Sequence, residues 1–186
     1  MKGILFKEEM FRAVVEGRKT KTRRIIKIDP SARLIGKGIT GFTTFEIHGQ
    51  GCPGIYPKYE RGEIVYLKEP YILIKKYPCA VDENSKILKA EYKYDKRTHV
   101  QKIIPWKNKL FMPEKYARYF IRILNVRVER LQEITEEDAI SEGVFIHPVY
   151  PSPRMEFASL WDKINKSNNW DANPWVWVIE FERVIL

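Results

Sequence analysis

A ten-residue stretch near the end of the chain reads Trp175-Val176-Trp177-Val178-Ile179-Glu180-Phe181-Glu182-Arg183-Val184. Its side chains alternate with a period of two, which predicts a β-strand. One face is apolar and is expected to lie on the core: Trp175, Trp177, Ile179 and Phe181. The opposite face changes from valine to glutamate, and acidic side chains would repel a phosphate backbone. We therefore expect the aromatic residues of this strand to be core and not a base-stacking platform.

Working outward, the same reasoning predicts strands at residues 2–6, 24–28, 41–47, 62–69, 90–94 and 119–130. In the last of these, the predicted core face carries Phe120, Leu124, Val126 and Val128. Helices are expected at residues 8–16, from an N-cap at Thr135 to Glu142, and from Ser152-Pro153 onward, where Pro occupies the first helical position.

No regular alternation of strand and helix is visible, so the elements predict an α+β fold with mixed or antiparallel strands. A small, partly open β-barrel with helices at its ends fits this order best. Residues 1–186 are expected to form a single domain. The polar, weakly periodic region of about residues 70–115 is expected to be an insertion between core strands.

Several classes of protein are disfavoured by composition. No run of 18 apolar residues is present, so we expect no membrane partner. The cysteines and histidines show no zinc spacing: Cys52, Cys79, His48, His99 and His147. We expect a reduced, cytoplasmic protein that needs no metal and no cofactor. The sequence leaves the oligomeric state open.

Five cations follow Gly17 within seven residues, Arg18-Lys19-Thr20-Lys21-Thr22-Arg23-Arg24. So many cations are not expected in a dry core, so the segment should face something negative. Its threonine hydroxyls can bind phosphate oxygens or, once deprotonated, attack a carbonyl. The segment predicts an anion or nucleic-acid contact, and the expected ligand-binding residues are Arg18, Lys21, Arg23 and Arg24.

The charge of the chain is unevenly distributed. Residues 1–100 hold 21 Lys/Arg and 12 Asp/Glu, whereas residues 101–186 hold 12 of each, so the net charge of +9 lies entirely in the first part. This asymmetry is typical of a surface that binds a polyanion such as RNA. The alternative is a lysine-rich solvated surface without a partner.

Three residues form a candidate catalytic set. Like charges around Lys19 disfavour its charged form, so it could act as a base toward Thr22, three residues along. Glu142 lies in the last turn of a predicted helix, where a carboxylate costs ~0.3–1 kcal/mol unless a cation compensates. Pairing with the basic segment would remove that cost. The alternatives are a strand-edge threonine and a solvated glutamate.

Three parts of the sequence together resemble the ASCH family of the PUA-like superfamily, in particular its longer phage-associated members. They are residues 16–24, residues 128–139 running on to Glu142-Gly143, and residues 160–165 with residues 173–181. The resemblance implies a PUA-like β-barrel with a cleft for RNA or a nucleobase-containing ligand. Only about residues 70–115 lack strong support from it.

Small bacterial proteins similar to this one hydrolyse N4-acetylcytidine. The resemblance implies that Thr22 is the nucleophile, Lys19 its activating base, Glu142 a group that transfers a proton or positions the substrate, and Arg24 a residue that orients the substrate. The chain departs from those hydrolases in its greater length and in the charge of Lys21 near the proposed nucleophile. These departures favour a phosphorylated or polymeric ligand.

The leading hypothesis is thus a domain that binds RNA or a nucleotide or nucleoside in a basic cleft, with possible hydrolysis at Lys19, Thr22 and Glu142. The alternatives are an amidohydrolase of acylated cytidine, a ribonuclease, and a phage accessory protein without chemistry, because a shared fold does not fix function.

Overall fold

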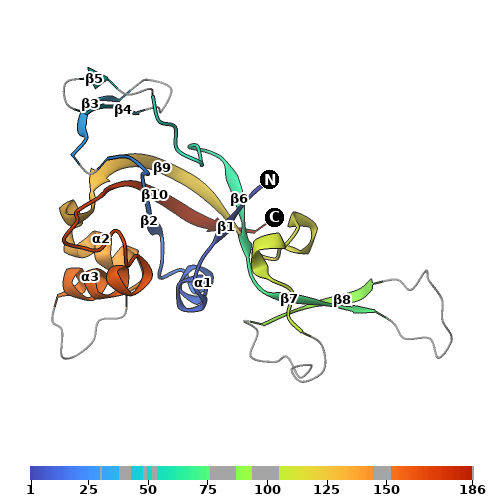
Figure 1. Cartoon of the computed structure of the whole chain (residues 1–186). Coiled ribbons are helices and arrows are strands. Elements are labelled where there is room, and N and C mark those ends of the chain that lie inside the picture. Colours follow the sequence, from blue (N-terminus) through green and yellow to red (C-terminus); the bar gives the residue numbers. More distant parts are fainter. Residues whose placement is uncertain are drawn as a thin grey trace.

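A five-stranded mixed sheet lies at the centre of the computed structural model, which describes residues 1–29, 31–37, 43–47, 50–51, 54–75, 87–93, 105–144 and 152–185 (Figure 1). Its strand order is β1 (Lys2–Leu5), β6 (Ile64–Lys68), β9 (Phe120–Arg130), β10 (Trp175–Val184), β2 (Lys21–Ile25). β1 and β6 are parallel, and the other pairs are antiparallel. This arrangement confirms the predicted α+β class.

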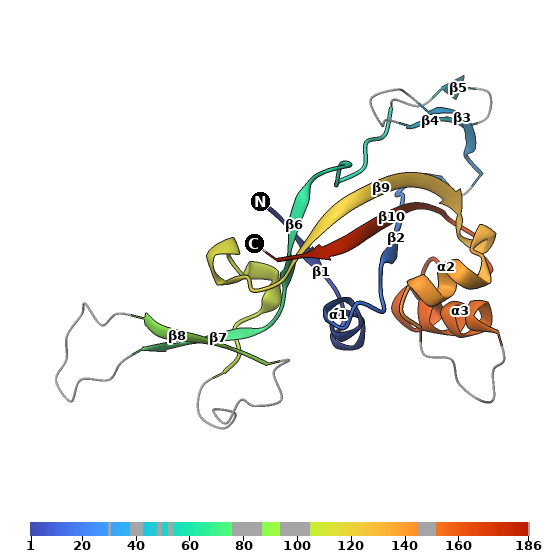
Figure 2. The same ribbon diagram turned by 180° about the vertical axis from the view of Figure 1, so that it is seen from behind.

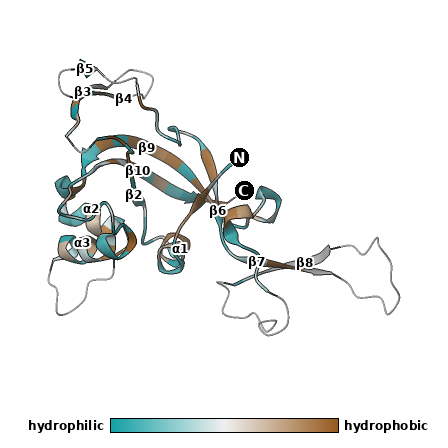
Figure 3. Cartoon of the chain, in the orientation of Figure 1, coloured by the Kyte–Doolittle hydropathy of each residue, from teal (hydrophilic) through white to brown (hydrophobic). Residues whose placement is uncertain are grey.

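The strand that the alternation predicted, β10, pairs with both β9 and β2. Hydrophobic and hydrophilic residues alternate along β9 and β10 in Figure 3. Trp177, Ile179 and Phe181 are buried in the main core cluster, as expected. Val176 and Val178 on the opposite face are buried as well, in a second cluster formed with two helices. β10 is therefore covered on both faces over its first half.

The predicted core face of β9 is correct only in part. The register between β9 and β10 shifts between Glu180 and Phe181, where Ile179 pairs with Val126 but Phe181 pairs with Ile123. A bulge of this kind inserts an extra residue and moves the following side chains to the other face. Consequently Ile121 and Ile123 are buried, whereas Leu124 is exposed.

The two edge strands of the sheet, β1 and β2, approach each other without closing a barrel. Among the described residues no backbone ladder joins them. A side chain bridges the gap instead, because Arg24 Nη2 donates a hydrogen bond to the Leu5 carbonyl at 2.7 Å. No closed barrel is found among the described strands, so the resemblance to a PUA-like barrel stays a prediction.

The helices lie below the long strands β9 and β10 in Figures 1 and 2, with α1 next to the gap between β1 and β2. They are α1 (Glu8–Val15), α2 (Glu136–Ser141) and α3 (Pro153–Ile164). Their starts match the sequence expectations: the Thr135 hydroxyl accepts from the Asp138 N–H, and the Ser152 hydroxyl accepts from the Met155 N–H. α2 and α3 pack together on the β10 face that carries Val176 and Val178.

Two smaller sheets extend from the centre. β3 (Arg33–Lys37), β4 (Thr43–Ile47) and β5 (Gln50–Gly51) form one, and Phe45 packs against Trp175. β7 (Tyr71–Lys75) and β8 (Ile87–Tyr92) form a hairpin between β6 and β9, within the predicted insertion. The described residues also form three short 3₁₀-helices: η1 (Lys109–Phe111), η2 (Glu114–Tyr116) and η3 (Leu131–Glu133).

The burial of β10 generates a stability prediction. Trp177 is 8% exposed, so Trp177→Ala should lower the free energy of unfolding by ~3–5 kcal/mol, because it removes a large side chain from a packed core. Chemical denaturation monitored by circular dichroism measures this change. Phe111→Ala is the matched control, since Phe111 is 74% exposed and should change stability by less than about 0.5 kcal/mol. Equal effects of the two substitutions would contradict this core assignment.

Candidate functional site

Backbone hydrogen bonds fix the segment that carries Lys19. α1 ends at Val15, and Gly17 follows its C-cap with a φ of +78°, which suits glycine. The chain then folds back on the helix. The N–H groups of Arg18 and Lys19 both donate to the Ala13 carbonyl, at 2.9 and 3.0 Å. The Thr20 N–H donates to the Ser141 carbonyl at 2.8 Å. The segment is therefore held between the end of α1 and the end of α2.

Lys19 and Glu142 form a buried ion pair at this point. Lys19 Nζ lies 2.5 Å from Glu142 Oε2 and also donates to the Glu142 carbonyl at 2.7 Å. Lys19 is 3% exposed and Glu142 is 4% exposed. The next residue, Gly143, has a φ of +79°, and a Cβ there would lie 2.9 Å from the Lys19 Cβ. Glycine at position 143 thus permits the close approach of the two segments.

Arg23 extends the pair into a cluster of charges. Its guanidinium donates to Glu142 Oε1 at 3.1 Å and to Asp138 Oδ2 at 2.7 Å, and it lies 3.3 Å from Glu129. The Arg23 side chain has no exposed surface. Asp138 lies in α2 and Glu142 is the C-cap of this helix, four residues on, so the two carboxylates point to the same side and meet the same strand.

Asp138 is the second anion of this cluster. Burial raises the pKa of Asp138, but hydrogen bonds from Lys21 and Arg23, together with their charges, outweigh burial and hold the pKa of Asp138 below its usual value. Lys21 also lies 3.6 Å from Glu180 of β10. The Asp138 carboxylate is therefore stabilised as an anion by two cations of β2.

Most cations of the basic segment have partners within the protein itself, whereas the sequence predicted an external anion for them. Four of the five cations are paired with carboxylates of the protein itself: Arg18 with Glu16, Lys19 with Glu142, Lys21 with Asp138 and Glu180, and Arg23 with Asp138, Glu142 and Glu129. Residues 21–25 form the edge strand β2, which places Lys21 and Arg23 against α2. A buried cation is tolerated where carboxylates compensate it.

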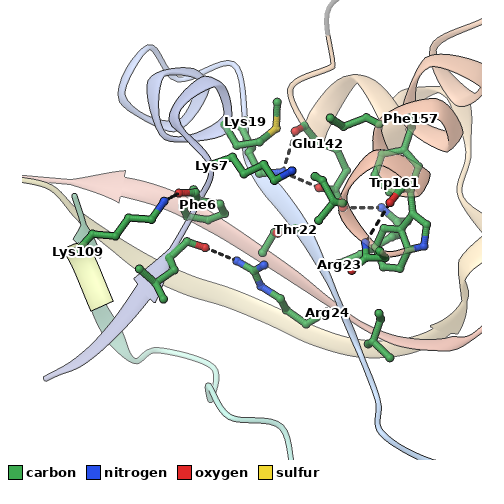
Figure 4. Close-up of a pocket in the computed structure, with 16 residues that line it drawn as sticks. Phe6, Lys7, Lys19, Thr22, Arg23, Arg24, Lys109, Glu142, Phe157 and Trp161 are labelled. Carbon is green, nitrogen blue, oxygen red and sulfur yellow. Dashed lines mark hydrogen bonds and ion pairs between the residues drawn. The ribbon is translucent and has the colours of Figure 1, made fainter. Parts of the chain in front are cut away.

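A cavity of about 290 Å³ lies beside the Lys19–Glu142 pair, in the gap between β1 and β2 (Figure 4). Lys19, Thr22 and Glu142 all line it, so the structure brings the three sequence-predicted residues together. Thr22 is nearly buried and lies on the edge strand β2, so the alternative of an ordinary strand-edge threonine also fits the structure. The alternative of a solvated glutamate is wrong, because Glu142 is buried.

The expected ligand-binding residues divide into two groups. Arg24 lines the cavity and lies over the Phe6 ring, 5.3 Å from its centre. Arg23 also lines the cavity, and its Nε is buried without a hydrogen-bond partner among the described residues. Arg18 and Lys21 do not line this cavity; Arg18 borders a neighbouring one beyond Met10.

Burial changes the acid–base properties of the site. Burial lowers the pKa of Lys19 below its ordinary value, the Glu142 carboxylate opposes this effect, and the charges of Arg24 and Arg23 add to it. The pKa of Arg24 is also lowered, by burial, with Tyr59 and Glu142 acting in the opposite direction. Lys19 is thus a lysine in which desolvation favours the neutral amine.

Other cavity residues were not predicted as functional. Phe6, Phe157 and Trp161 supply aromatic walls, and Lys7 and Lys109 add positive charge. The pattern on α3 indicated that Phe157 and Trp161 are buried, but it could not show that they border a cavity. Lys109 lies in the predicted insertion, 85 positions from Arg24, and no local signal connects the two.

Metal and membrane sites are not seen in the described part of the chain. No group of three His, Cys, Asp or Glu residues there could hold a metal ion. Every cysteine and histidine considered above, from His48 to His147, lies outside the described residues. None of the described helices is long and apolar enough to cross a bilayer.

Comparisons with known proteins give little further information. No family model matches the chain, and no curated protein matches it. The crystal structure of protein EF3133 from Enterococcus faecalis V583, described by the family-model DUF984, is 12% identical with a TM-score of 0.42. The alignment covers 100% of this chain and 82% of that chain. At this TM-score the likeness supports no inference about fold or function.

The charge cluster generates a second stability prediction. Arg23→Ala should lower the free energy of unfolding by ~3–5 kcal/mol, because it leaves Asp138 and Glu142 with fewer compensating charges in a buried place. Arg18→Ala is the control in the same segment, since the Arg18 side chain is half exposed and its pair with Glu16 contributes at most about 1 kcal/mol. Urea denaturation measures both values. An Arg23→Ala protein as stable as the Arg18→Ala control would contradict the assignment of Arg23 to the buried charge cluster.

Proposed function

We propose that this chain binds a nucleobase-containing ligand in the cavity between β1 and β2 and hydrolyses an acyl amide on it, as in an N4-acylated cytidine. The observation that carries the proposal is the placement of a buried lysine, Lys19, beside a cavity that is also lined by Thr22 and Glu142. The resemblance to N4-acetylcytidine hydrolases assigns roles to the same three residues.

A buried lysine–glutamate pair is poorly explained by stability alone. Removing two charges from water costs several kcal/mol per ion, and a well-packed apolar pair is often as stable. Strongly perturbed ionisable groups in a cavity are instead typical of functional sites. Lys19 meets this description, because burial lowers its pKa and one of its neighbours in the cavity carries a hydroxyl.

The proposed chemistry is an acyl transfer through Thr22. The neutral Lys19 amine accepts the Thr22 hydroxyl proton as the oxygen attacks the amide carbonyl and forms a new C–O bond. The C–N bond then breaks, and the exocyclic amine of the base leaves with the proton that the lysine ammonium returns, while the Glu142 carboxylate positions the ammonium group. Water hydrolyses the acyl-threonine, which releases the acid and restores the hydroxyl.

The walls of the cavity suit a flat, uncharged ring. Phe157 and Trp161 form a tilted aromatic pair with ring centres 5.9 Å apart, and Phe6 lies opposite beneath Arg24 and Lys19. Ligand pockets typically combine apolar walls with a few placed polar groups. Arg23 Nε is buried without a hydrogen-bond partner in the described part of the chain, and a ligand or a water molecule would satisfy this donor.

Binding of long RNA along the basic segment has weaker support. A polyanion site needs cations that are available to neutralise phosphates. Here the acidic side chains of α2 and β10 already hold Lys21 and Arg23, and Glu16 holds Arg18. The ribonuclease alternative depends on the same cations and loses support for the same reason.

The proposal predicts a defined pattern of activity. Thr22→Val keeps the shape of the side chain but removes the nucleophile, so acetate release from N4-acetylcytidine should stop. Lys19→Met should reduce turnover by about 10²–10⁴-fold through loss of the base. The double variant should be no worse than Thr22→Val alone, because the residues act as one unit. Thr22→Ser keeps a hydroxyl and should retain part of the activity.

Chromatographic separation of cytidine from N4-acetylcytidine measures this reaction with purified protein. Lys27→Gln is a suitable control, because Lys27 is exposed and does not line the cavity. Wild-type protein that releases no more cytidine than Thr22→Val would disprove the hydrolytic part of the proposal.

A further inference from the structure

Three cations gather on the turn that connects β1 to α1. Arg24 Nη2 donates to the Leu5 carbonyl at 2.7 Å, and Lys109 Nζ donates to the Phe6 carbonyl at 2.6 Å. The next residue along the chain is Lys7, and all three cationic side chains line the cavity (Figure 4). They come from an edge strand, a 3₁₀-helix and a turn, so the fold and not the local sequence brings them together.

The charge on this side of the cavity is positive. Glu142 is the sole carboxylate among the described lining residues, and it is held by Lys19 and Arg23. In the described part of the chain no carboxylate lies within ion-pairing distance of Lys7 or Arg24. The nearby Glu8 pairs with Arg12 at 2.9 Å. The site therefore has a surplus of positive charge on its β1–α1 side.

Two further properties favour an anion at this place. Burial lowers the pKa of Lys109, Glu8 opposes this, and the charges of Lys7 and Lys93 lower the pKa further, so the cations repel one another. α1 also begins here, at Glu8, and Lys7 provides no side-chain cap. The amide groups of a helix N-terminus favour a negative charge nearby.

We propose that Lys7, Arg24 and Lys109 bind the phosphate of a nucleotide, so that the ligand of this cavity is a nucleoside monophosphate and not a free nucleoside. The inference rests on the proposed function, in which the base lies beside Lys19 and Thr22. It gives the insertion a role, because Lys109 reaches the cavity from η1, between the β7–β8 hairpin and β9. The cations form one cluster and not a track, so they fit one phosphomonoester and not an RNA backbone.

The test compares three ligands by isothermal titration calorimetry with the whole protein at constant ionic strength: cytidine, cytidine 5′-monophosphate, and a short oligoribonucleotide with internal cytidines. The monophosphate should bind at least about tenfold more tightly than cytidine, because charge-assisted hydrogen bonds are added. Lys7→Gln and Lys109→Gln should each reduce this ratio toward one. Lys27→Gln, an exposed lysine outside the cavity, should keep it.

The outcomes distinguish failure of this inference from failure of the proposed function. Equal binding of cytidine and its monophosphate overturns the phosphate site but leaves the proposed function intact. An oligonucleotide that binds more tightly than the monophosphate, or a preference that survives both lysine substitutions, also overturns it. If neither small ligand binds, both proposals fail. A preferred monophosphate whose N4-acetyl derivative is not hydrolysed supports the phosphate site and removes the hydrolytic activity.

Discussion

The fold around the cavity depends on the cluster of charges between β2 and α2. Lys19 and Arg23 come from one side, and Asp138 and Glu142 come from the other, with bonds of 2.5 to 3.1 Å between them. Each partner is nearly buried, so the protein supplies the main partners of these charges. These ion pairs therefore hold the ends of α1 and α2 and the edge strand β2 together, and residues of these elements line the cavity.

This cluster also changes the meaning of the basic composition. A net charge of +9 and a run of cations are typical of nucleic-acid-binding proteins, but a sequence does not show which cations are neutralised inside the fold. Here Arg23 and Lys21 hold α2 against the sheet, whereas Arg24 and Lys7, which have no carboxylate partner among the described residues, face the cavity. The basic segment thus contains cations that hold the fold together and one, Arg24, that faces the cavity.

Much of this arrangement could be predicted from the sequence. Alternation predicted β10, capping residues predicted the starts of α2 and α3, and the awkward position of Glu142 at a helix end predicted a cationic partner. The bulge that exposes Leu124 could not be predicted, since it depends on pairing with another strand. The strand predicted at residues 24–28 begins earlier, because β2 covers Lys21–Ile25. Its start was missed, since charged residues are uncommon in strands and the carboxylate partners of Lys21 and Arg23 lie more than 100 positions away. The sequence also did not show that Lys109 lines the cavity, because Lys109 lies far along the chain from Lys7 and Arg24.

The central claim is that desolvation makes Lys19 a base in spite of its carboxylate partner. An NMR titration of lysine side chains, with the Lys19 signal assigned from a Lys19→Arg variant, measures this directly. The account predicts that Lys19 titrates below the ordinary lysine pKa of about 10.4. It also predicts a further decrease in Glu142→Gln, because the Glu142 charge raises the pKa of Lys19. A Lys19 that titrates at or above the ordinary value would show that the ion pair outweighs burial, and it would contradict the account.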